Sequence, residues 1–165
     1  MKKYIVYILI GLLIITSLLF YNQFKNQKEL ENRVVGTFAS GIKDDVCLLE
    51  ELKNNPDIET LTELRENIIA HNTLLALRIH PHNKPIDYFW GISEFYQRII
   101  DNGIIEDEDY EKMKNVYVRF NNFYEDLFEM EHETDVNIKT FKELDKLVLY
   151  HFDKGLIEDG LMEEY

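Results

Sequence analysis

Residues 4–21 read YIVYILIGLLIITSLLFY, and only Gly11, Thr16 and Ser17 interrupt the apolar side chains. No charged residue occurs between Lys3 and Lys25, so the uncharged stretch is twenty-one residues long. At about 1.5 Å per residue, a helix of that length spans roughly 32 Å, against a bilayer hydrocarbon core of about 30 Å. The stretch therefore predicts a single transmembrane helix in residues 1–24, and it separates an anchor from the rest of the chain.

A cleaved signal peptide is the alternative explanation of this amino terminus. Its apolar stretch is usually only about 7–15 residues long, and the sequence LLFYNQFKNQ at the end of the run offers no small-x-small cleavage site. We therefore expect an uncleaved signal-anchor.

The orientation of the span is weakly encoded in the flanking charges. Lys2 and Lys3 precede the run, and Lys25, Lys28 and Arg33 follow it, so the positive-inside rule barely discriminates. A very short basic tail followed directly by the apolar run has the form of an export signal. We predict a single-pass protein of the cell membrane, with a cytoplasmic N-terminus and an extracytoplasmic C-terminal domain.

The rest of the chain is acidic and of a size that suits one domain. The net charge of the whole chain is −13, and residues 106–165 hold eighteen Asp and Glu against seven Lys and Arg. Proteins that bind DNA or RNA neutralise phosphates with Lys and Arg, so this charge argues against a nucleic-acid partner.

Apolar residues recur at three- and four-residue steps throughout residues 25–155, and no segment alternates as a strand does. We expect an all-α fold: an antiparallel bundle of about five helices, followed by an acidic C-terminal tail at 156–165. The expected helices end at 54, run from 56 to about 80, from 85 to 102, from 106 to about 132, and from 141 to about 154.

Local signals set most of these ends. The sequence Asn54-Asn55-Pro56 ends the first helix, Gly103 ends the third, and acidic residues at 106–109 favour the positive end of a helix dipole. Thr140 and Glu143 have the spacing of a capping box.

Three residues of the first helix deviate from its pattern. Gly36 and Gly41 predict close backbone packing or a bend, and Asp45 falls where a core residue is expected. Cys47, the only cysteine, is expected on or near a packed face, with a thiol that links two chains as the alternative.

The nearest approach to catalytic chemistry is a possible metal site. Glu129 and His132 form one Glu-x-x-His pair, whereas helical di-iron proteins need two such pairs and two further glutamates. His71 and His151 lie on apolar faces and would converge with His132 in a bundle. A histidine on an apolar face is more often a hydrogen-bonded core residue, so we expect no metal, no cofactor and no catalytic residue.

The third and fourth helices are unusually aromatic, with eleven of the 21 aromatic residues between Tyr88 and Phe128. Tyr88, Phe89 and Trp90 are consecutive and fan over roughly 200° of a helix, more than the apolar stripe of about 100° that a surface helix buries. If Phe89 faces the core, Tyr88 or Trp90 lies on a flank. These two residues are the predicted partner-binding surface, unless another element covers them.

Together these features favour a membrane-anchored, non-enzymatic module that binds an unknown protein at or near the outer membrane face. Two alternatives remain: a metal-binding bundle or enzyme that uses Glu129 and His132, and a membrane adaptor that faces the cytoplasm.

Overall fold

The structure, a computed structural model, describes residues 2–76, 84–128, 136, 138 and 140–161, without the side chains of residues 2–11 and 84–86. Its helices are α1 (Lys2–Asn54), α2 (Ile58–Ala76), α3 (Lys84–Asn102), α4 (Asp107–Leu127), α5 (Phe141–Phe152) and α6 (Gly155–Glu158). One isolated bridge between Phe128 and Val136 is the only β pairing within the described residues. The predicted all-α class is confirmed.

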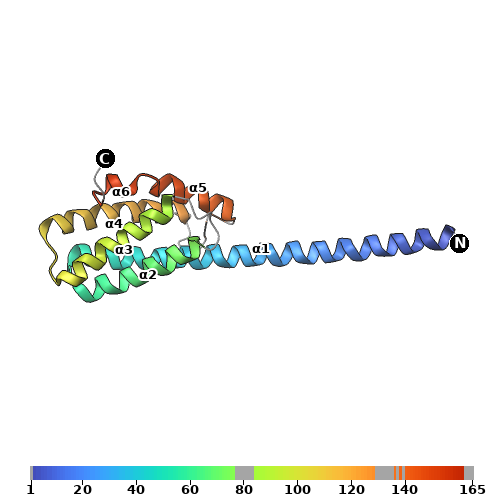
Figure 1. The fold of residues 1–165 in the computed structure, drawn as a ribbon, viewed down its shortest axis with the longest axis horizontal. Coiled ribbons are helices and arrows are strands. Elements are labelled where there is room, and N and C mark those ends of the chain that lie inside the picture. Colours follow the sequence, from blue (N-terminus) through green and yellow to red (C-terminus); the bar gives the residue numbers. More distant parts are fainter. Residues whose placement is uncertain (1, 77–83, 129–135, 137, 139, 162–165) are drawn as a thin grey trace. The chain divides into compact units, whose positions relative to one another are not determined.

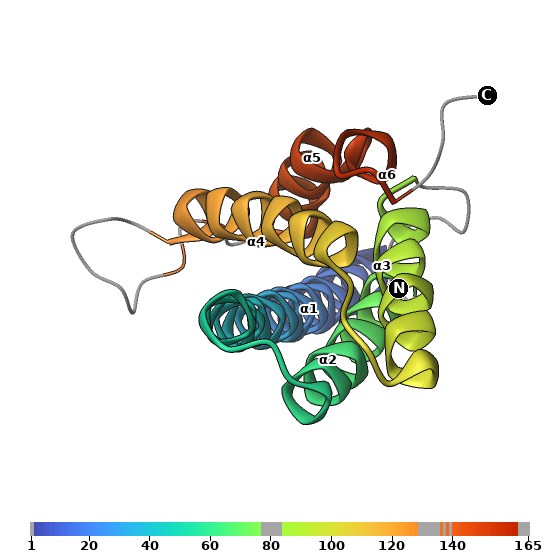
Figure 2. The same ribbon diagram turned by 90° about the vertical axis from the view of Figure 1, so that its left-hand side faces the viewer.

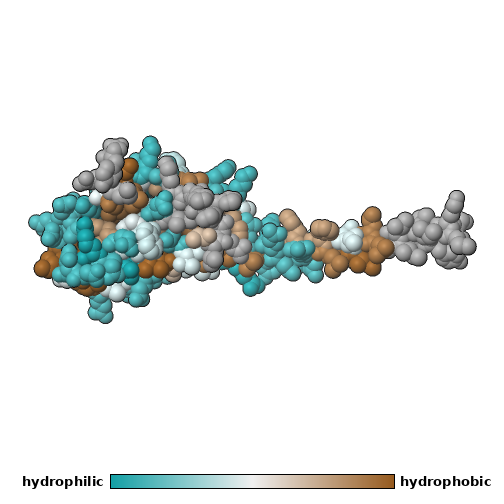
Figure 3. All heavy atoms as spheres, in the orientation of Figure 1, coloured by the Kyte–Doolittle hydropathy of each residue, from teal (hydrophilic) through white to brown (hydrophobic). Residues whose placement is uncertain are grey.

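The chain divides into two compact units, Met1–Val34 and Val35–Tyr165, and the division falls within α1. In the first unit, the large apolar side chains between residues 12 and 24 are all exposed, as the brown surface of this part of α1 shows in Figure 3. Where side chains are described, no helix is both long and apolar enough to cross a membrane. The predicted span starts at residue 4 and thus lies partly outside those residues, so it stays a prediction.

The second unit is a bundle of five helices, the end of α1 and α2 to α5, and the four-residue α6 packs beside α3 and α5 (Figure 1). An end-on view shows α2 beside α3 and α4 beside α5 (Figure 2), and α3 also contacts α5 and α6. The Phe38 ring joins α1 to two other helices, because it contacts His71 of α2 and Phe123 of α4. The predicted bundle of five helices is therefore present.

The core is formed by the apolar faces that the sequence predicts. Those of α2, α4 and α5 are buried at Leu61, Leu64, Ile68, Leu75, Met113, Val116, Phe120, Phe123, Leu127, Leu144, Val148 and Phe152. Helical periodicity thus identified the inward face of each of these helices correctly. Cys47 is an exception on α1, because it is exposed rather than packed against a face.

Most helix ends follow the predicted local signals. The capping box of Thr140 and Glu143 is formed, and Gly103 adopts φ +66° while its N–H bonds to the Ile99 carbonyl at 2.9 Å. Helix α2 begins at Ile58 instead of Pro56, because the Asp57 carboxylate accepts the Thr60 N–H at 2.8 Å and caps the helix.

The fourth helix is shorter than predicted. It ends at Leu127 and not near residue 132, because Phe128 takes an extended backbone and pairs with Val136. The sequence between them, residues 129–135, lies outside the described residues.

The described part of the predicted acidic tail packs against the bundle. Residues Gly155–Glu158 form α6, and the Leu161 N–H bonds to the Leu156 carbonyl at 2.9 Å. Asp159 is buried, so this segment is a docked turn up to residue 161.

Gly41 allows α1 and α2 to approach closely. A Cβ atom at this position would lie 2.0 Å from Nε2 of the buried His71, whereas a Cβ at Gly36 would meet no atom within 4 Å. The imidazole therefore occupies the space that a side chain at position 41 would need. Gly41 fulfils the predicted close packing, and Gly36 does not.

The two glycines make a matched pair for substitution. We expect Gly41→Ala to destabilise the bundle by about 1–3 kcal/mol, because the buried imidazole must move. We expect Gly36→Ala to stabilise it by roughly 0.5–1 kcal/mol, because alanine is the better helix former and open space surrounds position 36. Urea denaturation followed by circular dichroism measures both changes, and equal effects would contradict the assigned contact.

Candidate functional site

The three consecutive aromatic residues of α3 separate into two environments. Tyr88 and Phe89 are fully buried, whereas Trp90 is 57% exposed. Phe89 packs on Phe120 and Phe152 in the core. Trp90 is therefore the member of the trio that lies on a flank, and Tyr88 does not contribute to an exposed surface.

Tyr88 is buried because the C-terminal segment covers it. Its hydroxyl donates to Oδ2 of Asp159, and its ring stacks on Phe152 with centroids 4.9 Å apart. Burial and the adjacent Asp159 carboxylate raise the pKa of Tyr88 well above its usual value, so the phenol stays protonated as the donor. Tyr88 thus binds the C-terminal turn at Asp159.

Arg119 of α4 holds the other side of Asp159. Its guanidinium donates to both carboxylate oxygens at 2.8 Å, and also to the exposed Glu158 and to the His151 carbonyl. Two parallel bonds from a guanidinium to a carboxylate fix geometry as well as charge. Asp159 therefore joins α3, α4 and the C-terminal turn in one place.

The candidate metal ligands are not brought together by the described structure. Glu129 and His132 lie outside the described residues. His71 and His151 contact different rings: Phe38 contacts His71, Phe123 contacts His151, and the two phenylalanine rings meet edge to face with centroids 6.2 Å apart. Among the described residues, no group of three or more His, Cys, Asp or Glu side chains is placed to hold a metal ion.

Each of the two histidines has a carboxylate partner instead. His151 Nε2 lies 2.9 Å from Oδ2 of the exposed Asp126. His71 Nδ1 lies 2.7 Å from Oδ2 of Asp45, whose side chain is fully buried. The predicted role of a histidine on an apolar face, as a core residue with a polar partner, describes His71.

The Asp45 and His71 pair is the most unusual feature of the core. Burial raises the pKa of Asp45, and the contacts with His71 and Asn67 oppose that rise without cancelling it. Tyr96 is also fully buried, and its hydroxyl has no hydrogen-bond partner within the described residues. The raised pKa of the buried Asp45 carboxyl therefore makes the contact between α1 and α2 sensitive to the protonation of this group.

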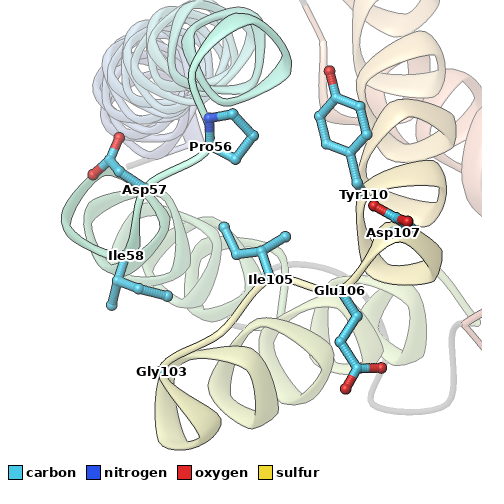
Figure 4. Close-up of a pocket in the computed structure, with 8 residues that line it drawn as sticks. All are labelled: Pro56, Asp57, Ile58, Gly103, Ile105, Glu106, Asp107 and Tyr110. Atoms are coloured by element: carbon cyan, nitrogen blue, oxygen red, sulfur yellow. The ribbon is translucent and has the colours of Figure 1, made fainter.

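A cavity of about 410 Å³ lies at one end of the bundle, between the α1–α2 and α3–α4 connections. Its lining combines apolar and acidic side chains (Figure 4): Pro56, Asp57, Ile58, Gly103, Ile105, Glu106, Asp107 and Tyr110. The Thr60 N–H lowers the pKa of Asp57, and α4 starts beside Glu106 and Asp107. These carboxylates therefore lie at the N-terminal ends of α2 and α4, where negative charge interacts favourably with the helix dipole.

The sequence places Asp45 at a core position but indicates no partner for it. Nothing in the sequence indicates the roles of Arg119 and Asp159. The register of Asp45 on the inward face of α1 was the available signal. Arg119 and Asp159 are forty positions apart and have no local pattern that links them.

The chain matches no protein-family model, no curated protein and no solved structure.

The Asp159 junction gives a stability prediction with an internal control. Asp159→Ala leaves the buried Tyr88 hydroxyl without its partner and removes two of the bonds to the half-buried Arg119, and we expect a loss of about 3 kcal/mol. Glu158→Ala removes a carboxylate from the same guanidinium, but this carboxylate is exposed, so the loss should stay below about 1 kcal/mol. Chemical denaturation compares the two variants, and an equally small loss in both would contradict the junction.

The buried carboxylate gives a pH prediction. Asp45 has a folded-state pKa above its ordinary value of 3.8, so its stabilising contribution is present in acid and is lost as pH rises through the folded-state pKa. As the pH rises above about 4, the melting temperature of wild type should therefore fall relative to that of Asp45→Asn.

Glu50→Gln is the control for this measurement, because it removes a carboxylate charge from an exposed position of the same helix. The prediction fails if Asp45→Asn follows the wild-type curve at every pH.

Proposed function

We propose that this chain is a single-pass membrane protein whose acidic helical bundle binds another protein at or near the outer face of the membrane, without catalysing a reaction. The observation that carries the binding role is Trp90, which stays 57% exposed while the two preceding aromatic residues enter the core. Tryptophan is enriched among the residues that dominate binding energy at protein interfaces.

The anchor is supported by sequence and by exposure together. In the described part of the apolar run, consecutive residues from Leu18 to Tyr21 are each more than half exposed, so apolar side chains point in all directions from α1. A helix that is apolar all round needs an apolar environment, and lipid supplies one. Exit residues Phe20, Tyr21 and Phe24 suit the membrane interface, where aromatic rings are enriched.

The net charge of −13 narrows the class of partner. Nucleic acids and anionic lipid headgroups attract Lys and Arg and are repelled by such a surface. A protein is therefore the partner that the charge favours.

Photo-crosslinking in intact membranes tests the binding role. A photoreactive phenylalanine derivative replaces Trp90 in the full chain, and the matched variant carries it at Tyr150, an aromatic position of α5 that is 80% exposed. We expect a defined protein adduct from position 90 and none from position 150. Capture from position 150 alone, or from neither position, would overturn the proposed surface.

Labelling of Cys47 in the same cells measures on which side of the membrane the bundle lies, because Cys47 is exposed and is the only cysteine. A membrane-impermeant maleimide added to intact cells should label it if the bundle lies outside. Labelling only after the cells are opened would place the bundle in the cytoplasm and favour the adaptor alternative. Recovery of the chain in the soluble fraction would contradict the anchor.

A further inference from the structure

The outward side of α3 carries a line of carboxylates around Trp90. Steps of three and four residues place five side chains on one side of this helix, which we call the α3 stripe. Its members are Asp87, Trp90, Glu94, Gln97 and Asp101. All of them are exposed except Gln97, which is half-buried. At about 1.5 Å per residue, the α3 stripe is roughly 21 Å long.

The charge of the α3 stripe is uniformly negative. Helix α3 carries two cations: Arg98 is held by Asp109 at 2.9 Å and is thereby directed to α4, and the side chain of Lys84 lies outside the described residues. Within the described part of the chain, neither Asp87 nor Glu94 makes an ion pair. These two carboxylates flank Trp90, one turn before it and one turn after it.

The pairing of an exposed indole with flanking carboxylates selects a particular kind of group. An apolar partner side chain on Trp90 would remove water from Asp87 and Glu94 without replacing their hydrogen bonds, which is costly. A cation satisfies both features, because tryptophan is the best cation–π acceptor and a carboxylate is the natural partner of an ammonium or guanidinium. Arginine fits best, since its planar group stacks on a ring while its edge donates hydrogen bonds.

We infer that the partner of this module presents a basic, arginine-containing segment to the α3 stripe, with a cation seated on Trp90 between Asp87 and Glu94. The inference rests on the proposed function and adds the chemistry of the partner to it. Two copies of this chain do not pair stripe to stripe, because both α3 stripes carry the same negative charge. The overall charge of −13 also draws a basic segment toward the bundle before contact.

Trp90 is the only tryptophan, so its fluorescence reports on the site directly. The full chain in zwitterionic detergent micelles is titrated with a capped tetra-arginine peptide, and with tetra-lysine and tetra-glutamate peptides for comparison. We expect a saturable change in emission with tetra-arginine, a weaker one with tetra-lysine and none with tetra-glutamate. The apparent affinity should fall as salt is added, because the flanking ion pairs are exposed.

Paired charge variants separate a local site from general attraction. Asp87→Asn combined with Glu94→Gln should weaken tetra-arginine binding about tenfold. The matched control, Asp44→Asn combined with Glu50→Gln, removes two charges from exposed positions of α1 and should change binding less than about twofold. Equal weakening in both pairs, or no saturable change in wild type, would overturn the inference.

Different results would overturn the basic chemistry of the partner and the protein-binding role of the bundle. If position 90 captures a protein in membranes and the Asp87 and Glu94 variants do not alter that capture, a basic partner is excluded while the binding role stands. If position 90 captures nothing, the binding role itself is overturned, whatever the peptides do.

Discussion

The contact between α1 and α2 fixes the bundle, because the His71 imidazole lies where a side chain of residue 41 would be. Asp45, one turn after Gly41 on the same helix, lies 2.7 Å from that imidazole. If either helix slid by one turn, Asp45 would be buried without a partner and the imidazole would meet a side chain. Both outcomes are costly, so the pair sets the register of the two helices.

Aromatic contacts then fix the positions of α3, α4 and α5 relative to α1 and α2. Phe38 touches both His71 and Phe123, and Phe123 in turn packs on Phe152 at 4.9 Å. Phe152 stacks on Tyr88, whose hydroxyl reaches Asp159 in the C-terminal turn. Helix α5 and the C-terminal turn at Asp159 thereby cover one side of α3, whereas Trp90 and the acidic residues of the α3 stripe stay at the surface.

The polar and charged side chains of the bundle therefore occupy two environments, the core and the outer surface of α3. The buried polar groups Asp45, His71 and Tyr96 lie inside, whereas the negative charge of α3 lies outside around Trp90. A partner at the α3 stripe therefore meets a surface whose helices are already held in place. The proposed anchor would confine such an encounter to the membrane surface, where a local concentration of partner matters more than high affinity.

The sequence by itself determined what depends on neighbours within about four residues. The faces of α2, α4 and α5, the capping box at Thr140, the end of α3 at Gly103 and the apolar character of residues 4–21 are such features. The tertiary structure decided which flank of a helix is covered, because the covering group comes from far along the chain. Tyr88 is buried by Asp159, seventy-one positions later, and Asp45 is paired by a histidine of the next helix. Periodicity showed that Tyr88, Phe89 and Trp90 cannot all face one core, and only the packing of distant segments left Trp90 as the exposed one.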